Sequence, residues 1–206
     1  MYYARGVRVL IAIMVATGVA VADDTRPDQP GDLVEVASVI PDAVIDMRYA
    51  TKDNFTGDVL YPKAVCKLRR AVAARLARAA QALRKQDRRL LIWDCYRPLS
   101  IQKLLWERVP DPRYVADPKQ GSRHNRGAAI DLALVNKDGS EVTLPTKFDE
   151  FSRAAHRSRA LAGKHGAEAK RLSAAMTAAG FASIPTEWWH FDAPDSAKYA
   201  ISDEPL

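Results

Sequence analysis

The sequence predicts a single α+β domain, in which helices flank a sheet of antiparallel strands. Short apolar stretches typical of strands recur along the chain, and two long segments show the three- and four-residue apolar spacing of amphipathic helices. The two kinds of segment do not alternate regularly. A regular alternation would instead indicate a doubly wound parallel sheet.

Strands are predicted at residues 33–39, 44–47, 89–93, 128–135, 141–144 and 188–192. Pro41 separates the first two of these strands, because proline cannot donate a hydrogen bond within a sheet. Residues 136–140 (Asn-Lys-Asp-Gly-Ser) have the composition of a hairpin turn, which makes 141–144 the returning strand. Residues 49–61 are predicted to form a polar loop that carries aromatic side chains.

Helices are predicted at residues 62–86, 100–108 and 164–179, with a shorter helix within 147–159. Pro62 is favourable at the first position of a helix, where the missing N–H is not needed. Ser100 is a good N-cap for the second helix, and Gly180 is a typical residue after the end of the last.

The N-terminus is predicted to be a signal peptide covering residues 1–22. Arg5 and Arg8 precede an apolar run, and Ala20-Val21-Ala22 is the small-x-small pattern at which signal peptidases cut. The alternative is a retained membrane anchor, for which the apolar run is too short, since a transmembrane helix needs ~20 apolar residues. We therefore expect cleavage after Ala22, a linker at 23–32, a domain at 33–206, and a periplasmic or secreted protein without a stable membrane span.

The formal charge of +6 comes largely from lysine and arginine within residues 63–89. A nucleic-acid surface is one interpretation of such a cluster. Apolar residues at helical spacing lie between the basic ones, however, so the arginines are better explained as the solvent-facing side of an amphipathic helix. We expect no nucleic-acid partner. The basic face would bind anionic cell-wall polymers only weakly.

The two cysteines, Cys66 and Cys95, allow two interpretations. In an oxidising compartment an even number of cysteines favours a disulfide. Two buried free thiols are the alternative, because free cysteine is among the most buried residue types. Cys95 follows Asp94, an acid that would raise the pKa of a thiol, so a cysteine hydrolase is disfavoured.

Asp131 is the most informative single residue, because it interrupts an apolar strand. A buried ionised carboxylate needs a cation or several hydrogen-bond donors, so Asp131 either binds a metal or forms a buried salt bridge or a hydrogen bond to a loop backbone. His124 lies seven residues earlier, and Gly127 between them allows the chain to turn back over the strand.

A second motif, Glu-Trp-Trp-His-Phe-Asp, spans residues 187–192. His190 alone would more often be a packed core residue, but Glu187 beside it and the pair His124 and Asp131 favour a ligand. Two imidazoles and a carboxylate are suited to catalytic Zn²⁺, which leaves a position for water, and Glu187 could accept a proton from that water. A metal-assisted hydrolase is the leading hypothesis.

Together these motifs resemble the zinc D,D-peptidases, and within them the VanX-type D-alanyl-D-alanine dipeptidases. The shared pattern is Ser-x-His-x-x-Gly-x-Ala-x-Asp at 122–131 with Glu-x-x-His at 187–190. Further signals are Tyr-Ala-Thr at 49–51, Asp-Asn-Phe-Thr-Gly at 53–57, Asp-Cys-Tyr-Arg-Pro at 94–98 and Phe-Asp-Glu-Phe at 148–151. Trp188 favours the dipeptidase branch, since related D,D-carboxypeptidases usually have proline there. The resemblance covers residues 33–195.

The resemblance implies that His124, Asp131 and His190 bind one Zn²⁺ per chain. It also implies that Glu187 is the general base and then the acid, and that Arg97 stabilises the oxyanion. A salt bridge from Arg97 to Asp94 is the structural alternative for that arginine.

A free dipeptide carries an ammonium and a carboxylate close together, so we expect a small pocket. The candidates for substrate binding are Ser122 and Asp149 or Glu150 at the ammonium, with Tyr49 and Tyr96 as walls. The two acids could instead begin a helix.

The expected function is hydrolysis of D-alanyl-D-alanine in peptidoglycan turnover. A D,D-carboxypeptidase or endopeptidase acting on stem peptides, and a non-catalytic zinc-bearing wall-binding module, remain alternatives. The sequence leaves the oligomeric state open.

Overall fold

The structure, a computed structural model, describes Met1, Gln29 and residues 31–206. Apart from Met1, the predicted signal peptide at 1–22 lies outside the described residues, as does most of the predicted linker at 23–32. Among the residues that are described, no helix combines the length and apolar character needed to cross a bilayer.

A five-stranded sheet forms the centre of the domain, in the order β2-β4-β5-β7-β6. Its strands are β2 (Val44–Ile45), β4 (Arg88–Asp94), β5 (Ala129–Asn136), β7 (His190–Asp192) and β6 (Ala182–Ser183). Only the β2–β4 pair is parallel, and the other neighbours are antiparallel. A separate two-stranded sheet pairs β1 (Leu33–Glu35) with β3 (Lys67–Arg69). The predicted α+β class is confirmed.

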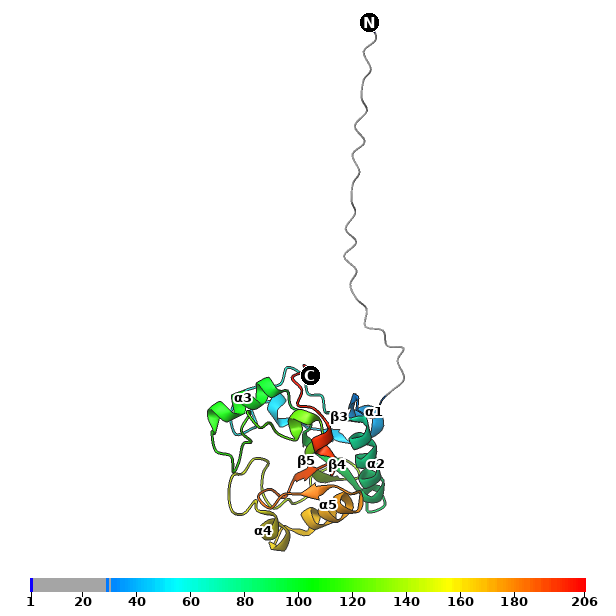
Figure 1. Ribbon diagram of the computed structural model, residues 1–206. Coiled ribbons are helices and arrows are strands. Elements are labelled where there is room, and N and C mark those ends of the chain that lie inside the picture. Colours follow the sequence, from blue (N-terminus) through cyan, green and yellow to red (C-terminus); the bar gives the residue numbers. More distant parts are fainter. Residues whose placement is uncertain (2–28, 30) are drawn as a thin grey trace.

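Two helices cover one face of the sheet (Figure 1). Helix α2 (Arg70–Arg84) buries Leu76 and Leu83, and α5 (Ala167–Ala178) buries Leu172 and Met176 against the strands. Helix α3 (Leu99–Arg108) lies away from this pair, on the side of the molecule where the chain ends (Figure 1). The remaining helical segments are α1 (Val36–Val39), α4 (Arg157–Ala162) and the 3₁₀ turns η1 (Arg48–Ala50), η2 (His124–Arg126) and η3 (Ser196–Lys198).

The prediction that the long helix begins at Pro62 is wrong, because α2 begins at Arg70. Residues 67–69 are instead extended and pair with 33–35. Residues 36–39, predicted as part of the first strand, form a short helix. In both places pairing between distant parts of the chain overrides local helix or strand preference, which is a weak influence by comparison.

Two other local predictions need correction. Ser100 is not the N-cap of α3, which begins one residue earlier and has Pro98 in that position. The free N–H of Ser100 donates instead to the Asp203 carboxylate, 2.7 Å away. The predicted returning strand at 141–144 is reduced to a single bridge between Val135 and Glu141.

A disulfide joins Cys66 to Cys95, which resolves the choice between a bond and two free thiols. Cys66 immediately precedes β3, and Cys95 immediately follows β4. The bond therefore connects the small sheet to the central one. Both cysteines are buried, with exposed fractions of 2% and 0%.

Gly127 provides the turn between η2 and β5 that the sequence predicted. Its φ of +64° is unfavourable for residues with a side chain, and a Cβ there would lie 2.6 Å from Leu33 Cδ2. Its carbonyl accepts a hydrogen bond from the Arg69 N–H. Two constraints therefore favour glycine at position 127: the left-handed backbone and the close contact with the small sheet.

We predict that Gly127→Ala lowers the free energy of unfolding by about 1–3 kcal/mol, the cost of a strained left-handed residue, with the contact to Leu33 adding to it. Urea denaturation measures this change. Gly139→Ala is the matched control, because Gly139 also has a positive φ, +89°, but a Cβ there meets no atom closer than 3.6 Å. Equal losses in the two variants would contradict a role for the close contact.

Candidate metal centre and active site

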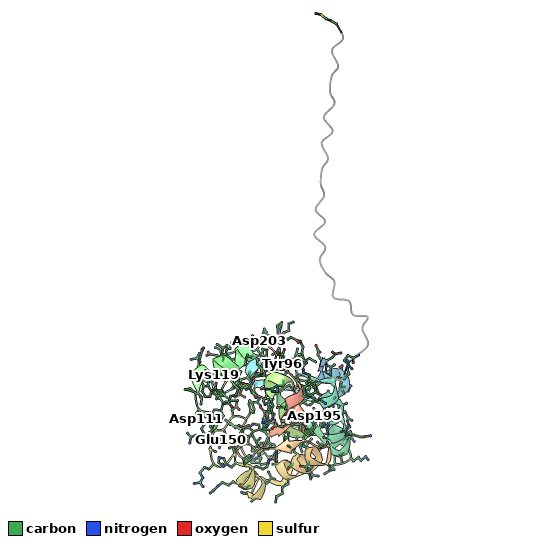
Figure 2. All side chains as sticks on the ribbon, viewed as in Figure 1. Tyr96, Asp111, Lys119, Glu150, Asp195 and Asp203 are labelled. Atoms are coloured by element: carbon green, nitrogen blue, oxygen red, sulfur yellow. A yellow bond between two sulfur atoms is a disulfide. The ribbon has the colours of Figure 1, made fainter. Side chains whose placement is uncertain are left out.

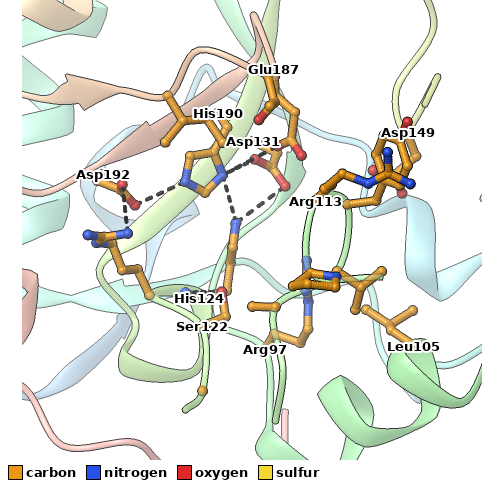
Figure 3. Close-up of a pocket in the computed structure, with 18 of the residues that line it drawn as sticks. Arg97, Leu105, Arg113, Ser122, His124, Asp131, Asp149, Glu187, His190 and Asp192 are labelled. Atoms are coloured by element: carbon orange, nitrogen blue, oxygen red, sulfur yellow. Dashed lines mark hydrogen bonds and ion pairs between the residues drawn. The ribbon is translucent and has the colours of Figure 1, made fainter. Parts of the chain in front are cut away.

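Three predicted metal ligands converge from two adjacent strands and the turn before one of them. Asp131 on β5 is paired directly with His190 on β7, and His124 lies in η2. One ligand atom from each lies within 4.8 Å of the other two, and all three residues are buried. Figure 3 shows these side chains pointing toward one another at one side of a cavity.

The distances between the ligand atoms fit a small divalent ion. His124 Nε2 lies 3.2 Å from His190 Nδ1 and 3.4 Å from Asp131 Oδ2, and His190 Nδ1 lies 2.9 Å from Asp131 Oδ1. Ligands at zinc bond lengths in a tetrahedral arrangement are about 3.3 Å apart. Burial alone would raise the pKa of Asp131, but the two histidines lower it far below its usual range, so the carboxylate is ionised.

Hydrogen bonds on the outer side of both imidazoles orient them. The Cys95 carbonyl lies 2.7 Å from His124 Nδ1, and Asp192 Oδ1 lies 2.9 Å from His190 Nε2. Each of these oxygens can accept a hydrogen bond from an N–H on the ring nitrogen that faces away from the centre. In the neutral imidazoles this arrangement directs the lone pairs of His124 Nε2 and His190 Nδ1 toward each other, as metal ligands require. Burial lowers the pKa of His190, but hydrogen bonds to Asp131 and Asp192 outweigh it and raise that pKa to about 10, so a metal would bind there in exchange for a proton. The donor set therefore fits a divalent metal.

Glu187 lies beside this cluster, with Oε2 3.9 Å from His190 Nδ1. Burial raises the pKa of Glu187 to about 7. A carboxylate with a pKa near neutral can both accept and return a proton, which is what a general acid–base group requires. The position and the pKa thus agree with the predicted role of Glu187.

Arg97 is held in the cavity wall by Asp94. Its Nη2 and Nε lie 2.5 and 3.1 Å from Asp94 Oδ2, and its Nη1 donates to Gln102 Oε1 at 2.8 Å. Asp94 Oδ1 also accepts hydrogen bonds from the Tyr61 hydroxyl and the Cys95 N–H. The predicted salt bridge is present, and Arg97 also lines the cavity that holds the metal candidates. The two interpretations of Arg97 are therefore compatible.

Asp149 lies across the cavity from the histidines (Figure 3). It accepts a hydrogen bond of 2.6 Å from the Tyr49 hydroxyl, and burial raises its pKa well above the usual range. Its φ of +52° is uncommon for a residue other than glycine. A strained backbone and a buried carboxyl group with a raised pKa, both at a cavity, are features of functional sites.

Of the residues predicted to bind substrate besides Asp149 and Tyr49, only Ser122 lines this cavity, and Glu150 and Tyr96 do not. Ser122 lines the cavity, where its Oγ accepts a hydrogen bond from the His124 N–H. Glu150 lies on a neighbouring groove and bonds Ser152. Tyr96 does not line the cavity, because its hydroxyl bonds Ser202 and the Glu204 carbonyl near the C-terminus, on the side of Asp203 (Figure 2).

The cavity is larger than the small pocket expected for a dipeptide. Its volume is about 490 Å³, in the range of pockets that bind drug-sized ligands. Its lining includes three aromatic residues from separate loops, with Phe151 in ring contact with both Phe55 and Tyr114.

Sequence reasoning missed two residues that support the site. Asp192, 6% exposed, orients His190 and lies 3.4 Å from Arg123, and Gln102, 0% exposed, holds Arg97. Asp192 could have been found, because residues two apart in a strand face the same side. Gln102 gave no comparable signal, since it lies on a helix whose orientation the sequence does not define.

Buried imidazoles and a carboxylate that converge next to a second carboxylate of near-neutral pKa are typical of metallopeptidases. A model of the D-ala-D-ala dipeptidase family, peptidase family M15, matches residues 29–204. This chain therefore belongs to that family and is a metallopeptidase, which confirms the resemblance seen in the motifs.

Curated relatives agree with this assignment. A D-alanyl-D-alanine dipeptidase of Escherichia coli strain K12 is 38% identical over 172 residues, covering 82% of this chain and 89% of the relative. D-alanyl-D-alanine dipeptidases of Enterococcus faecalis strain V583 and Enterococcus faecium are 32% and 30% identical, each over 78% of this chain and 86% of the relative.

We predict that Asp94→Asn lowers the free energy of unfolding by at least about 3 kcal/mol, because it leaves the buried Arg97 guanidinium without a counter-charge. Asparagine keeps the oxygen that accepts from Tyr61 and Cys95, but it places an amide NH2 against Arg97, so the loss combines the missing charge with the missing acceptor. Asp111→Asn is the control, since its partner Arg113 is exposed and such pairs contribute little. Urea denaturation measures both variants. If the free energy of unfolding fell by a similarly small amount in each, this account of Arg97 would be contradicted.

Proposed function

We propose that this chain is a zinc-dependent dipeptidase that hydrolyses D-alanyl-D-alanine to two D-alanines in peptidoglycan turnover. The observation that carries the proposal is the convergence of His124, Asp131 and His190 beside Glu187, in a family whose relatives bear this activity in their names. We propose a periplasmic or secreted location, supported by the pattern of residues 1–22 and by the disulfide, which is typical of oxidising compartments.

In this proposal His124, Asp131 and His190 hold Zn²⁺. When bound there, zinc polarises the scissile carbonyl and lowers the pKa of a water molecule. Glu187 accepts the proton from that water and then donates it to the leaving amine, as its near-neutral pKa allows. Arg97, fixed by Asp94 and Gln102, stabilises the negative charge that develops on the carbonyl oxygen without having to reorient.

Asp149 and Tyr49 are proposed to bind the substrate ammonium. Burial raises the pKa of Asp149 well above its usual range even though Arg97 acts to lower it, so an entering ammonium adds a favourable partner for the carboxylate. The Ser122 hydroxyl lies on the same cavity, next to His124, within the set proposed to bind the dipeptide. Ser122 and Asp149 line the same cavity as the ligand cluster, and both remain candidates for binding the ammonium.

The second candidate is a D,D-carboxypeptidase or endopeptidase that acts on longer stem peptides. The observation in its favour is the cavity volume of about 490 Å³, which exceeds what a dipeptide of two alanines requires. Against it stands Asp149, because a longer chain would place a neutral amide where the carboxylate favours an ammonium.

The decisive experiment compares turnover of D-Ala-D-Ala, L-Ala-L-Ala and a stem pentapeptide before chelation, after chelation and after zinc is added back. We expect activity on D-Ala-D-Ala that chelation abolishes and zinc restores, with far weaker activity on the other two. Glu187→Gln is the control, expected to keep zinc but lose about 10²–10⁴-fold in kcat. Comparable turnover of the pentapeptide would favour the second candidate, and zinc binding without turnover would indicate a wall-binding module.

Asp149→Asn is predicted to weaken substrate binding while stabilising the protein. Asparagine tolerates the positive φ and still accepts from Tyr49, but it cannot pair with an ammonium, so KM should rise about tenfold or more. Because the folded-state pKa of Asp149 is raised, its ionised form costs stability at neutral pH. The variant should gain about 1–3 kcal/mol there.

This gain should vanish as the pH falls below about 3.9, the ordinary carboxyl pKa, since Asp149 is then neutral in both the folded and unfolded states. Steady-state kinetics and thermal unfolding from pH 3 to 8 measure the two effects. An unchanged KM would remove Asp149 from the binding site, and a loss of stability at neutral pH would contradict the account of its burial.

A further inference from the structure

The Cys66–Cys95 disulfide lies directly behind the predicted metal ligand His124. The carbonyl of Cys95 is the acceptor for His124 Nδ1–H at 2.7 Å, and this hydrogen bond defines which nitrogen of the ring faces the cluster. The N–H of the same residue donates to Asp94 Oδ1 at 2.9 Å. One residue of the disulfide thus contacts both a metal-ligand candidate and the carboxylate that holds Arg97.

Residues 96–97, which follow Cys95, are hydrogen-bonded to two neighbouring parts of the chain. The Tyr96 N–H donates to the Lys67 carbonyl at 2.9 Å, and the Arg97 N–H donates to the His124 carbonyl at 3.1 Å. The segment therefore lies between the strand that follows Cys66 and the turn that carries His124. These backbone bonds are of ordinary strength, and the disulfide is the one covalent link across the described part of this junction.

We propose that the Cys66–Cys95 disulfide positions the metal centre, by fixing the Cys95 carbonyl that orients His124. The inference rests on the metal ligands of the proposed function. A carbonyl that accepts from the outer nitrogen of a histidine ligand fixes the orientation of the ring, and loss of such a partner weakens metal binding about 10- to 100-fold. Without the covalent link the carbonyl remains but is free to move, which lowers the metal affinity and makes it depend on redox conditions.

The test is the zinc dissociation constant of the double variant Cys66→Ala/Cys95→Ala, measured by competition with a chromophoric chelator. Both alanines keep the backbone groups, so the change is confined to the two buried sulfur atoms and the bond between them. We expect a dissociation constant at least about tenfold higher than that of the unmodified protein. Leu83→Ala is the matched control, because Leu83 is fully buried on α2, does not line the cavity and should lower thermal stability without altering zinc affinity.

A second arm uses the unmodified protein and a small dithiol as reductant. Thiol–disulfide exchange oxidises the dithiol to its cyclic disulfide, while Cys66 and Cys95 together gain two electrons and two protons. The dithiol binds Zn²⁺ and Co²⁺ through its own thiolates, so it is removed under nitrogen before metal is added. With Co²⁺ in place of zinc, the visible absorption then reports the ligand arrangement. We expect reduction to change this spectrum and release metal to the chelator while far-ultraviolet circular dichroism stays unchanged. Reoxidation should reverse both effects.

These experiments distinguish a disulfide that positions the metal ligands from one that only stabilises the fold. A double variant with a dissociation constant within threefold of the unmodified protein, or an equal loss of affinity in Leu83→Ala, would overturn the proposal. Unfolding on reduction would also overturn it, because the disulfide would then act on the whole fold. If the oxidised, unmodified protein bound no zinc at all, the proposed function itself would fail, and this result is distinct from the others.

Discussion

The structure depends on placing an ionised carboxylate in the middle of a buried strand. All residues of β5 except the last are buried, and Asp131 interrupts their apolar sequence. Removing such a charge from water costs several kcal/mol unless it is paired. Strand geometry directs Ile130 and Leu132 to the opposite side from Asp131. Two histidines, one from the neighbouring strand and one from the preceding turn, then surround the carboxylate.

The remaining polar residues can be understood as supports for this arrangement. His190 is oriented by Asp192, His124 by the Cys95 carbonyl and Arg97 by Asp94. These partners come from β4, β7 and the segment after β4, so the centre forms only when the sheet is assembled. Asp149 differs, because it carries backbone strain and a buried carboxyl group without comparable compensation. That pattern is expected where substrate, not the protein, completes the interactions.

The chemistry was more predictable from the sequence than the boundaries of the elements. Asp131 in an apolar strand and Glu187 three residues before His190 are local patterns, and they identified residues that the structure brings together. The start of α2 lies eight residues after the predicted one, because residues 67–69 pair with 33–35, which are more than thirty positions away in the sequence. Tyr96 was misplaced for a related reason, since its hydroxyl contacts the C-terminal segment, whose path no local pattern reveals.

The most direct test of the account is a crystal structure of the zinc-loaded protein with anomalous diffraction measured at the zinc absorption edge. One anomalous peak per chain, bonded to His124 Nε2, His190 Nδ1 and a carboxylate oxygen of Asp131, is the predicted result. A peak bound by other residues, or a zinc-loaded crystal in which these three side chains contact no metal, would contradict it.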